Sequence, residues 1–344
     1  MINVGIVQMQ SIPLEIDKNL ECAGRLIAQV CENNAQLVVL PEFFSVGYSY
    51  AKEMMETAED RIIGKTVSWL KQQAKENSIY ILTSIYEADN SNYFNTMLLV
   101  GPDMNVQYYR KRNPFWQEFA LFQQGDYAGP GIFDTEYGRI GGVICFDAFA
   151  RETYDNLMRN QVDLVAIVAC WGSPSLMPRH PELKSARKML GRYSYLATEV
   201  LPAVYAKALQ VPVIHVGQGG MSQSPIPVPE YWPFKPIEHN VGAFWGHSHI
   251  RNAEGKKVIE AKAGESEFAG TAPVNIRHMP SRPEIHHTKF KSSYLSGSHY
   301  QIRPPSFMSK IMQEWCYRGF RKEYNSRREQ YVNNWNVSGA NLLA

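Results

Sequence analysis

Short apolar runs alternate with longer segments of helical periodicity along most of this chain, and this alternation limits the folds open to it. The runs are short enough to be single buried strands, and they lie at 2–7, 36–40, 139–144, 162–169 and 211–216. The helical segments lie between them, at 18–33, 66–77, 151–160 and within 183–209. Buried strands joined by helices are typical of sheets with helices on their faces. We therefore predict an α/β protein.

Further elements fill the gaps in this pattern. Runs rich in β-branched and aromatic residues predict more strands at 79–86, 94–100 and 105–109, with several others near 242–270. Asp17 is placed to cap the first helix. Two Pro-rich loops interrupt the pattern, at 172–181 and 221–236. The second is long enough to act as a lid over a site rather than as a tight turn.

The pattern ends near residue 280. Residues 281–305 carry proline and polar residues without periodicity, and 306–335 is typical of a helix with a mixed polar face. We therefore predict one domain over 1–279. A C-terminal extension over 280–344 would pack on this domain or on a neighbouring subunit.

Composition and charge exclude several classes of partner. The chain has 35 Lys+Arg and 33 Asp+Glu, so a net charge of +2 gives no electrostatic basis for nucleic-acid binding. No apolar run approaches the ~20 residues of a membrane span, and the N-terminus lacks a signal-peptide pattern. The five cysteines are scattered without C-x-x-C spacing, as is typical of reduced thiols. We expect a cytoplasmic protein with neither nucleic acid nor membrane as a partner.

Cys145 stands at the end of the predicted strand 139–144, and Arg151 begins the next helical segment. A thiol that is fixed by a strand and lies just before a helix N-terminus is well placed to become a thiolate. The same residue could also be core filler, because free cysteine is among the most buried residue types. Its role therefore depends on partners elsewhere in the chain.

Two other predicted strands also lead into an ionisable residue. Glu42 follows 36–40 through Pro41, and Lys111 follows 105–109 through Arg110. Each alone could be a solvated surface charge, but the carboxyl ends of strands form the ligand crevice of α/β proteins. A carboxylate can take the proton of a thiol, and an ammonium group lowers the thiol pKa and stabilises an oxyanion. The three residue types together predict acyl transfer through a thioester, without a histidine.

The motifs around these residues resemble those of the nitrilase superfamily of carbon–nitrogen hydrolases. Residues 37–42 with Gly47-Tyr48 resemble its glutamate motif, 109–111 its lysine motif and 143–147 its cysteine motif. Glu118 resembles the second glutamate that supports the lysine. Later landmarks extend the resemblance over about residues 2–275, and they are Trp171-Gly172, 206–213, Gly246-His247-Ser248 and Glu254-Gly255.

This resemblance implies a four-layer αββα sandwich with a catalytic triad of Glu42, Lys111 and Cys145. Glu42 would take the Cys145 proton, and the thiolate would attack an amide carbonyl or a nitrile carbon. Lys111 and a backbone N–H near Phe146 would stabilise the developing charge, and Glu118 would orient Lys111. The family resemblance implies no cofactor, a small-molecule substrate, and a homodimer or higher homo-oligomer.

The residues after the cysteine favour one branch of this family. Family nitrilases usually carry Trp-Glu there, whereas this chain has Phe146-Asp147, which is closer to the amidases and carbamoylases. We therefore predict hydrolysis of an amide or carbamoyl C–N bond. Three alternatives stay open: hydrolysis of a nitrile, transfer of the acyl group to an amine, and a non-catalytic binding or scaffold role.

Aromatic residues near the motifs are the candidates for substrate binding, namely Trp171, Phe146, Tyr48 and Trp116. His247 and His249 have the spacing of two residues on one face of a strand, which suits a metal ion. No third ligand is evident, so we predict no metal site.

Overall fold

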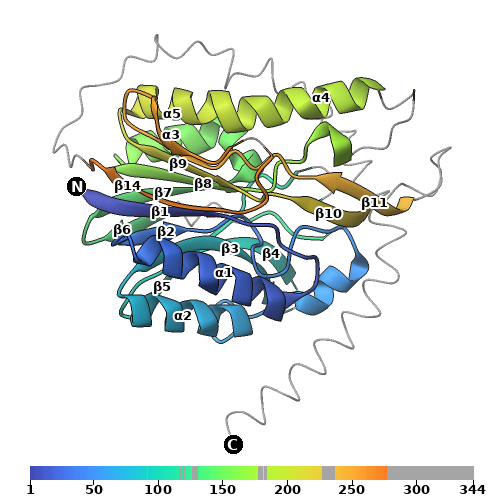
Figure 1. The fold of residues 1–344 in the computed structure, drawn as a ribbon, viewed down its shortest axis with the longest axis horizontal. Coiled ribbons are helices and arrows are strands. Elements are labelled where there is room, and N and C mark those ends of the chain that lie inside the picture. Colours follow the sequence, from blue (N-terminus) through green and yellow to red (C-terminus); the bar gives the residue numbers. More distant parts are fainter. Residues whose placement is uncertain are drawn as a thin grey trace, which may run out of the picture.

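Two six-stranded sheets pack face to face, and helices cover the outer side of each, which gives the predicted four-layer αββα sandwich (Figure 1). The structure is a computed structural model. It describes residues 1–90, 92–115, 118, 121–125, 131–176, 181, 184–226, 237–262 and 264–276.

The first sheet has the strand order β14-β1-β2-β3-β4-β5. Strands β1 and β2 are parallel neighbours joined through helix α1, as the alternating pattern predicted, and β14 pairs antiparallel with β1. The strands of this sheet are β1 (Ile2–Gln8), β2 (Leu37–Val39), β3 (Tyr80–Asp89), β4 (Asn92–Val100), β5 (Val106–Arg110) and β14 (Phe268–Val274).

Helices α1 (Ile16–Cys31) and α2 (Lys65–Asn77) cover the outer face of this sheet (Figure 1), and the short 3-10 helix η1 (Lys52–Thr57) precedes α2. The periodic apolar residues of α1 lie buried against the sheet, as predicted. The predicted cap is wrong, because Glu15 holds the N-cap position and Asp17 lies in the first turn. Asp17 instead forms an exposed ion pair with Lys65, at 2.5 Å, at the start of α2.

The second sheet has the order β13-β12-β9-β8-β7-β6, and β7, β8 and β9 run parallel. Its strands are β6 (Ile132–Thr135), β7 (Gly138–Ile144), β8 (Leu164–Ala169), β9 (Val213–Gly217), β12 (His249–Arg251) and β13 (Lys257–Glu260).

Three helices cover the outer face of the second sheet (Figure 1). They are α3 (Arg151–Arg159), α4 (Lys184–Tyr195) and α5 (Leu201–Leu209). The long helix predicted within 183–209 is confirmed, because α4 and α5 are continuous through the π-helical turn η6 (Leu196–Val200), whose flanking residues keep right-handed helical backbone angles. Two short 3-10 helices, η3 (Cys145–Phe149) and η4 (Pro174–Leu176), follow the ends of β7 and β8.

The Pro-rich segment predicted as a lid loop is partly a strand, which corrects that prediction. Strand β10 (Met221–Ile226) pairs with β11 (Ile237–Ala243) in a separate two-stranded hairpin. The register shifts between Ser224 and Ile226, so Pro225 lies at an irregularity, where a missing N–H is tolerated. Residues 227–236 lie outside the described residues, as does the predicted extension over 280–344.

Apolar side chains from both sheets fill the space between them. They include Val4 and Ile6 of β1, Val39 of β2, Ile144 of β7 and Val168 of β8, all fully buried. Burying such a side chain stabilises the fold by about 1.5–3 kcal/mol. The residues that follow β2 and β7, at 42 and 145, lie at the same end of the sandwich, because Glu42 contacts Cys170 at the end of β8, the parallel neighbour of β7.

Candidate active site

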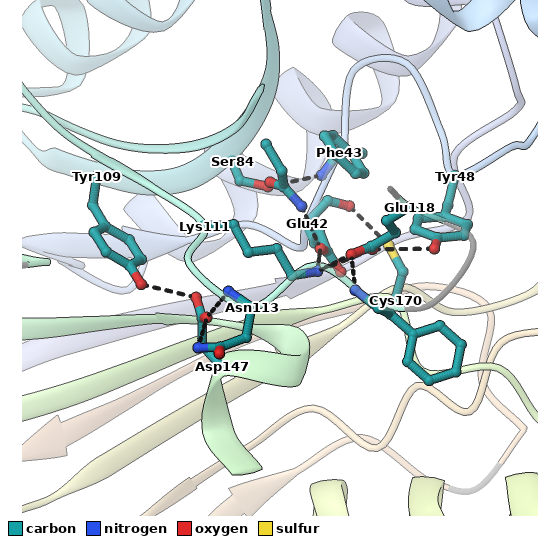
Figure 2. Close-up of polar contacts among 12 residues, drawn as sticks. Glu42, Phe43, Tyr48, Ser84, Tyr109, Lys111, Asn113, Glu118, Asp147 and Cys170 are labelled. Carbon is teal, nitrogen blue, oxygen red and sulfur yellow. Dashed lines mark hydrogen bonds and ion pairs between the residues drawn. The ribbon is translucent and has the colours of Figure 1, made fainter. Parts of the chain in front are cut away.

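Glu42 is held rigidly where the chain leaves β2. Leu40 still donates a backbone hydrogen bond to Leu82, and the Pro41 carbonyl accepts one from Thr83 Oγ1 at 2.9 Å. Phe43 then turns with a φ of 52°, and its N–H donates to Ser84 Oγ (Figure 2). The Glu42 side chain has no exposed surface. The neighbouring strand β3 therefore fixes where the carboxylate points.

Lys111 connects Glu42 to Glu118 at the centre of the site (Figure 2). It follows β5, and its N–H donates to the Asn95 carbonyl at 2.8 Å, so it is still paired with β4. Its Nζ donates to Glu42 Oε1 at 3.0 Å and to both oxygens of Glu118, at 2.9 and 2.8 Å. The three side chains are almost completely excluded from solvent, so this is an ion-pair network in a low dielectric.

Glu118 is itself held by two further donors. The Phe115 N–H donates to its Oε2 at 2.5 Å, and the Tyr48 hydroxyl donates to its Oε1 at 3.1 Å. The Tyr48 and Tyr50 hydroxyls are in turn 2.8 Å apart. Glu118 therefore has the position that the sequence predicted for it, in direct contact with Lys111.

Cys145 lies where β7 ends, as predicted, and it adopts a φ of 47°. This left-handed conformation is uncommon for a residue with a Cβ and costs about 1–3 kcal/mol. It turns the chain sharply from β7 into η3, so Cys145 is the first residue of a five-residue 3-10 helix that precedes α3. The thiol is buried, with 4% of the residue's surface exposed.

Burial and charge set the protonation of these groups. Burial raises the pKa of the Cys145 thiol well above its ordinary value, the Glu42 carboxylate raises it further, and Lys111 opposes them. The sequence suggested a lowered thiol pKa, so the net direction is opposite. Burial alone would lower the pKa of Lys111, but Glu118 and Glu42 outweigh it and raise that pKa. The resting state therefore has a protonated thiol beside a stably charged ammonium group.

Asn95 is a site residue that the sequence analysis missed. It lies on β4, is almost fully buried, and its Nδ2 donates to Glu42 Oε1 at 2.6 Å. Asn95 and Lys111 thus both bind the same carboxylate oxygen. Glu42 Oε2 is buried and has no hydrogen-bond partner in the described part of the chain. The sequence signal for Asn95 is that it is a polar residue within the otherwise largely apolar run 94–100.

Asp147 is a second residue whose contacts the sequence did not reveal. One of its oxygens accepts from the N–H and the Nδ2 of Asn113, both at 2.8 Å, and the other accepts from the Tyr109 hydroxyl at 3.0 Å (Figure 2). Asp147 is fully buried. It therefore ties the turn after Cys145 to the segment around Lys111.

The predicted substrate-binding residues have different surroundings. Phe146 and Trp171 belong to one series of ring contacts that runs from Phe115 through Phe146 and Phe149 to Trp171, with centroids 5.4–5.6 Å apart. The Trp171 Nε1 is buried and has no partner among the described residues. Tyr48 contacts Glu118 directly, and Trp116 lies outside the described residues.

His247 and His249 do not share one face of a strand. Strand β12 begins at His249, and His247 precedes it with a φ of 56°. His247 Nδ1 lies 3.2 Å from Glu199 Oε1, whereas the His249 ring stacks on His215. The described residues contain no group of three or more His, Cys, Asp or Glu side chains that could hold a metal ion.

The chain belongs to the carbon–nitrogen hydrolase family, whose model matches residues 3–277. A protein named omega-amidase NIT2-B from Xenopus laevis is 28% identical over 285 residues, which span 80% of this chain and 89% of that protein. A protein named nitrilase from Pyrococcus abyssi is 36% identical over 168 residues. That match spans 48% of this chain and 64% of the nitrilase.

Solved structures share the fold. Saccharomyces cerevisiae Nit3, described as a member of branch 10 of the nitrilase superfamily, has a TM-score of 0.61 at 21% identity, covering 78% of this chain and 89% of that one. A mutant of the amidase from Nesterenkonia sp. AN1 has a TM-score of 0.63 at 16% identity, covering 80% of this chain and 94% of that one. No helix among the described residues is long and apolar enough to cross a membrane.

Proposed function

We propose that this carbon–nitrogen hydrolase cleaves a non-peptide amide or carbamoyl C–N bond through a thioester on Cys145. The products would be ammonia or an amine and a carboxylic acid. The observation that carries the proposal is the arrangement around Glu42. Lys111 and Asn95 occupy Oε1, and Oε2 is buried and has no partner among the described residues. An unpaired buried carboxylate oxygen is costly, and it is available to accept a proton.

In the first half of the reaction Glu42 takes the proton of the Cys145 thiol, and the sulfur attacks the carbonyl carbon. The raised pKa of the thiol makes this base necessary. Negative charge develops on the carbonyl oxygen, where Lys111 and the backbone N–H of Phe146 stabilise it. The C–N bond then breaks, and Glu42 returns the proton to the departing nitrogen.

In the second half a water molecule donates its proton to Glu42 and attacks the thioester carbon. The C–S bond breaks, the acid leaves, and the thiol regains its proton. Glu118 stays in contact with Lys111 throughout and prevents the ammonium group from leaving Glu42. Removing an interaction of the oxyanion-stabilising type lowers turnover by about 10²–10³-fold.

Amide hydrolysis has more support than nitrile hydrolysis, because the omega-amidase relative matches 80% of this chain. Nitrile hydrolysis is the second candidate, and the shorter but more similar match to a protein named nitrilase favours it. The aromatic series from Phe115 to Trp171 supports an apolar acyl group on the substrate. A homo-oligomer and a cytoplasmic location stay predictions from the sequence.

The test is intact-protein mass spectrometry after incubation with amides, carbamoyl compounds and nitriles, together with an assay for released ammonia. We expect an acyl adduct on the wild type and none on Cys145→Ala, which should fold normally and release no ammonia. Cys31→Ser is the matched control, because Cys31 lies on α1 with no contact to the site. Full turnover by Cys145→Ala would refute the role of Cys145. Ammonia release from nitriles alone would select the second candidate.

A further inference from the structure

Cys170 is a second buried thiol beside the nucleophile, and the proposed mechanism does not use it. It follows β8, the parallel neighbour of β7, and Ile144 of β7 is in register with Val168 of β8. Cys145 is therefore level with Ala169, and Cys170 lies one residue further along. Neighbouring strands are about 4.8 Å apart and rise about 3.3 Å per residue, so the two Cα atoms are about 5.8 Å apart.

This Cα separation suits a disulfide, for which about 4.4–6.8 Å is usual. The left-handed turn at Cys145 does not change the estimate, because it redirects only the atoms after the Cys145 Cα. Both thiols are free in the structure, and both residues are buried, with 4% and 7% of their surface exposed.

Glu42, which follows β2 of the opposite sheet, interacts with both thiols. Cys170 Sγ donates to the backbone oxygen of Glu42 at 3.1 Å (Figure 2), and the carboxylate of Glu42 acts on the Cys145 thiol. The backbone N–H of Cys170 acts on the Cys145 sulfur as well, because it opposes the rise in the pKa of that thiol. The two thiols therefore interact electrostatically at the carboxyl ends of the neighbouring strands β7 and β8.

We propose that Cys145 and Cys170 form a reversible oxidation site, in which Cys170 captures the peroxide-oxidised nucleophile as an intramolecular disulfide. The reaction needs hydrogen peroxide as the oxidant. Unlike the proposed hydrolysis, it needs no amide substrate. Its result would be an inactive enzyme that a thiol reductant restores.

The chemistry balances in two steps. Glu42 takes the thiol proton, and the Cys145 sulfur attacks one oxygen of hydrogen peroxide. The O–O bond breaks, Glu42 passes its proton to the leaving oxygen, and this oxygen departs as water, which leaves a sulfenic acid on Cys145. The Cys170 sulfur then attacks the Cys145 sulfur, the S–S bond forms, the S–O bond breaks and a second water leaves. Two thiols are oxidised to one disulfide as one peroxide is reduced to two waters.

Without a neighbouring thiol, the sulfenic acid would react further with peroxide to sulfinic acid, which thiol reductants do not reverse. Cys170→Ser keeps a small polar side chain but cannot form the disulfide, so it separates the two outcomes. Cys31→Ser is the matched control, since it removes a thiol that lies on α1 in the outer helical layer.

The experiment treats the full-length wild type, Cys170→Ser and Cys31→Ser with hydrogen peroxide, with half of each sample then reduced by dithiothreitol. Peptide mapping should show a Cys145–Cys170 cross-link in the wild type and in Cys31→Ser, with nearly complete recovery of starting activity after reduction. Cys170→Ser should show sulfinic acid on Cys145 and recover less than about a tenth of its own starting activity.

Absence of the cross-link in oxidised wild type would overturn the proposal, as would equal recovery in Cys170→Ser. The cross-link is detected by mass spectrometry of the wild type, so the proposal can be tested even if Cys170→Ser fails to fold. Formation of the cross-link also does not require the enzyme to turn over an amide substrate. A cross-linked protein without amidase activity would therefore contradict the proposed function and leave the oxidation site standing.

Discussion

Replacing Lys111 by methionine should damage both stability and catalysis. The Nζ makes three hydrogen bonds of 2.8–3.0 Å to two buried carboxylates, Glu42 and Glu118. Removing one partner of a buried ion pair leaves uncompensated charge and costs about 3–5 kcal/mol. Thermal unfolding of a large domain shifts by about 2 °C per kcal/mol, so the melting temperature should fall by about 6–10 °C. Turnover should fall by at least about 10²-fold, because the oxyanion loses its ammonium partner.

Thermal unfolding followed by circular dichroism measures the first effect, and ammonia release measures the second. In Lys111→Met, two buried carboxylates lose their ammonium partner. Adding Glu118→Gln removes one of these two charges, so the double variant should be more stable than Lys111→Met alone. The control is Lys18→Met, since Lys18 pairs with Glu15 at an exposed site and should contribute less than about 1 kcal/mol. A melting temperature within about 2 °C of the wild type would refute the reasoning for Lys111→Met, as would additive losses in the double variant.

Three further predictions concern stability. Burial raises the pKa of Glu59 to about 7. The contribution of Glu59 to stability is therefore fully present below the pKa that it has in the unfolded chain, and it is lost as the pH rises through about 7. Glu59→Gln should gain stability relative to the wild type between about pH 5 and pH 8, as measured by urea denaturation. Gly142→Ala would place a Cβ 2.4 Å from Met97 Sδ and 2.5 Å from Phe133 Cε2, and urea denaturation should show a loss of about 1–3 kcal/mol. Tyr109→Phe removes a donor to the buried Asp147 and should cost about 1.5–3 kcal/mol in the same assay, while a loss below about 0.5 kcal/mol would contradict the role assigned to Asp147.

The apolar runs predicted sheets covered by helices because each run is a short, largely buried strand. The four-layer arrangement was predicted from the family resemblance. The segment 221–226 was missed for a physical reason. Pro225 is unfavourable in a strand, and only the register shift beside it makes the β10–β11 pairing possible. The first helix was misjudged at its start because Asp17 is a good capping residue by type, but the helix had already begun at Ile16.

The four charged or nucleophilic residues of the site were named from the sequence because local motifs mark them. Asn95, Asn113 and Asp147 make their important contacts with residues between 34 and 53 positions away along the chain, and sequence spacing does not reveal such contacts. Cys170 was visible in the sequence as a strand-end thiol, but its contact with Glu42 spans 128 positions. The fold brings these residues together through strand pairing within the first sheet, parallel and antiparallel, and through the packing of the two sheets on each other.

The site depends on strain at the two places where the chain leaves the facing sheets. Phe43, beside Glu42, has a φ of 52°, and Cys145 has a φ of 47°, although neither is glycine. Each such conformation costs about 1–3 kcal/mol, so it persists only where the surrounding structure overdetermines it. The core between the two sheets supplies that constraint, because Val39 and Ile144 are fully buried in it three residues and one residue before Glu42 and Cys145. The packing of the two sheets therefore fixes the positions of Glu42 and Cys145 before any substrate binds, which is the preorganisation that the proposed thioester chemistry would need.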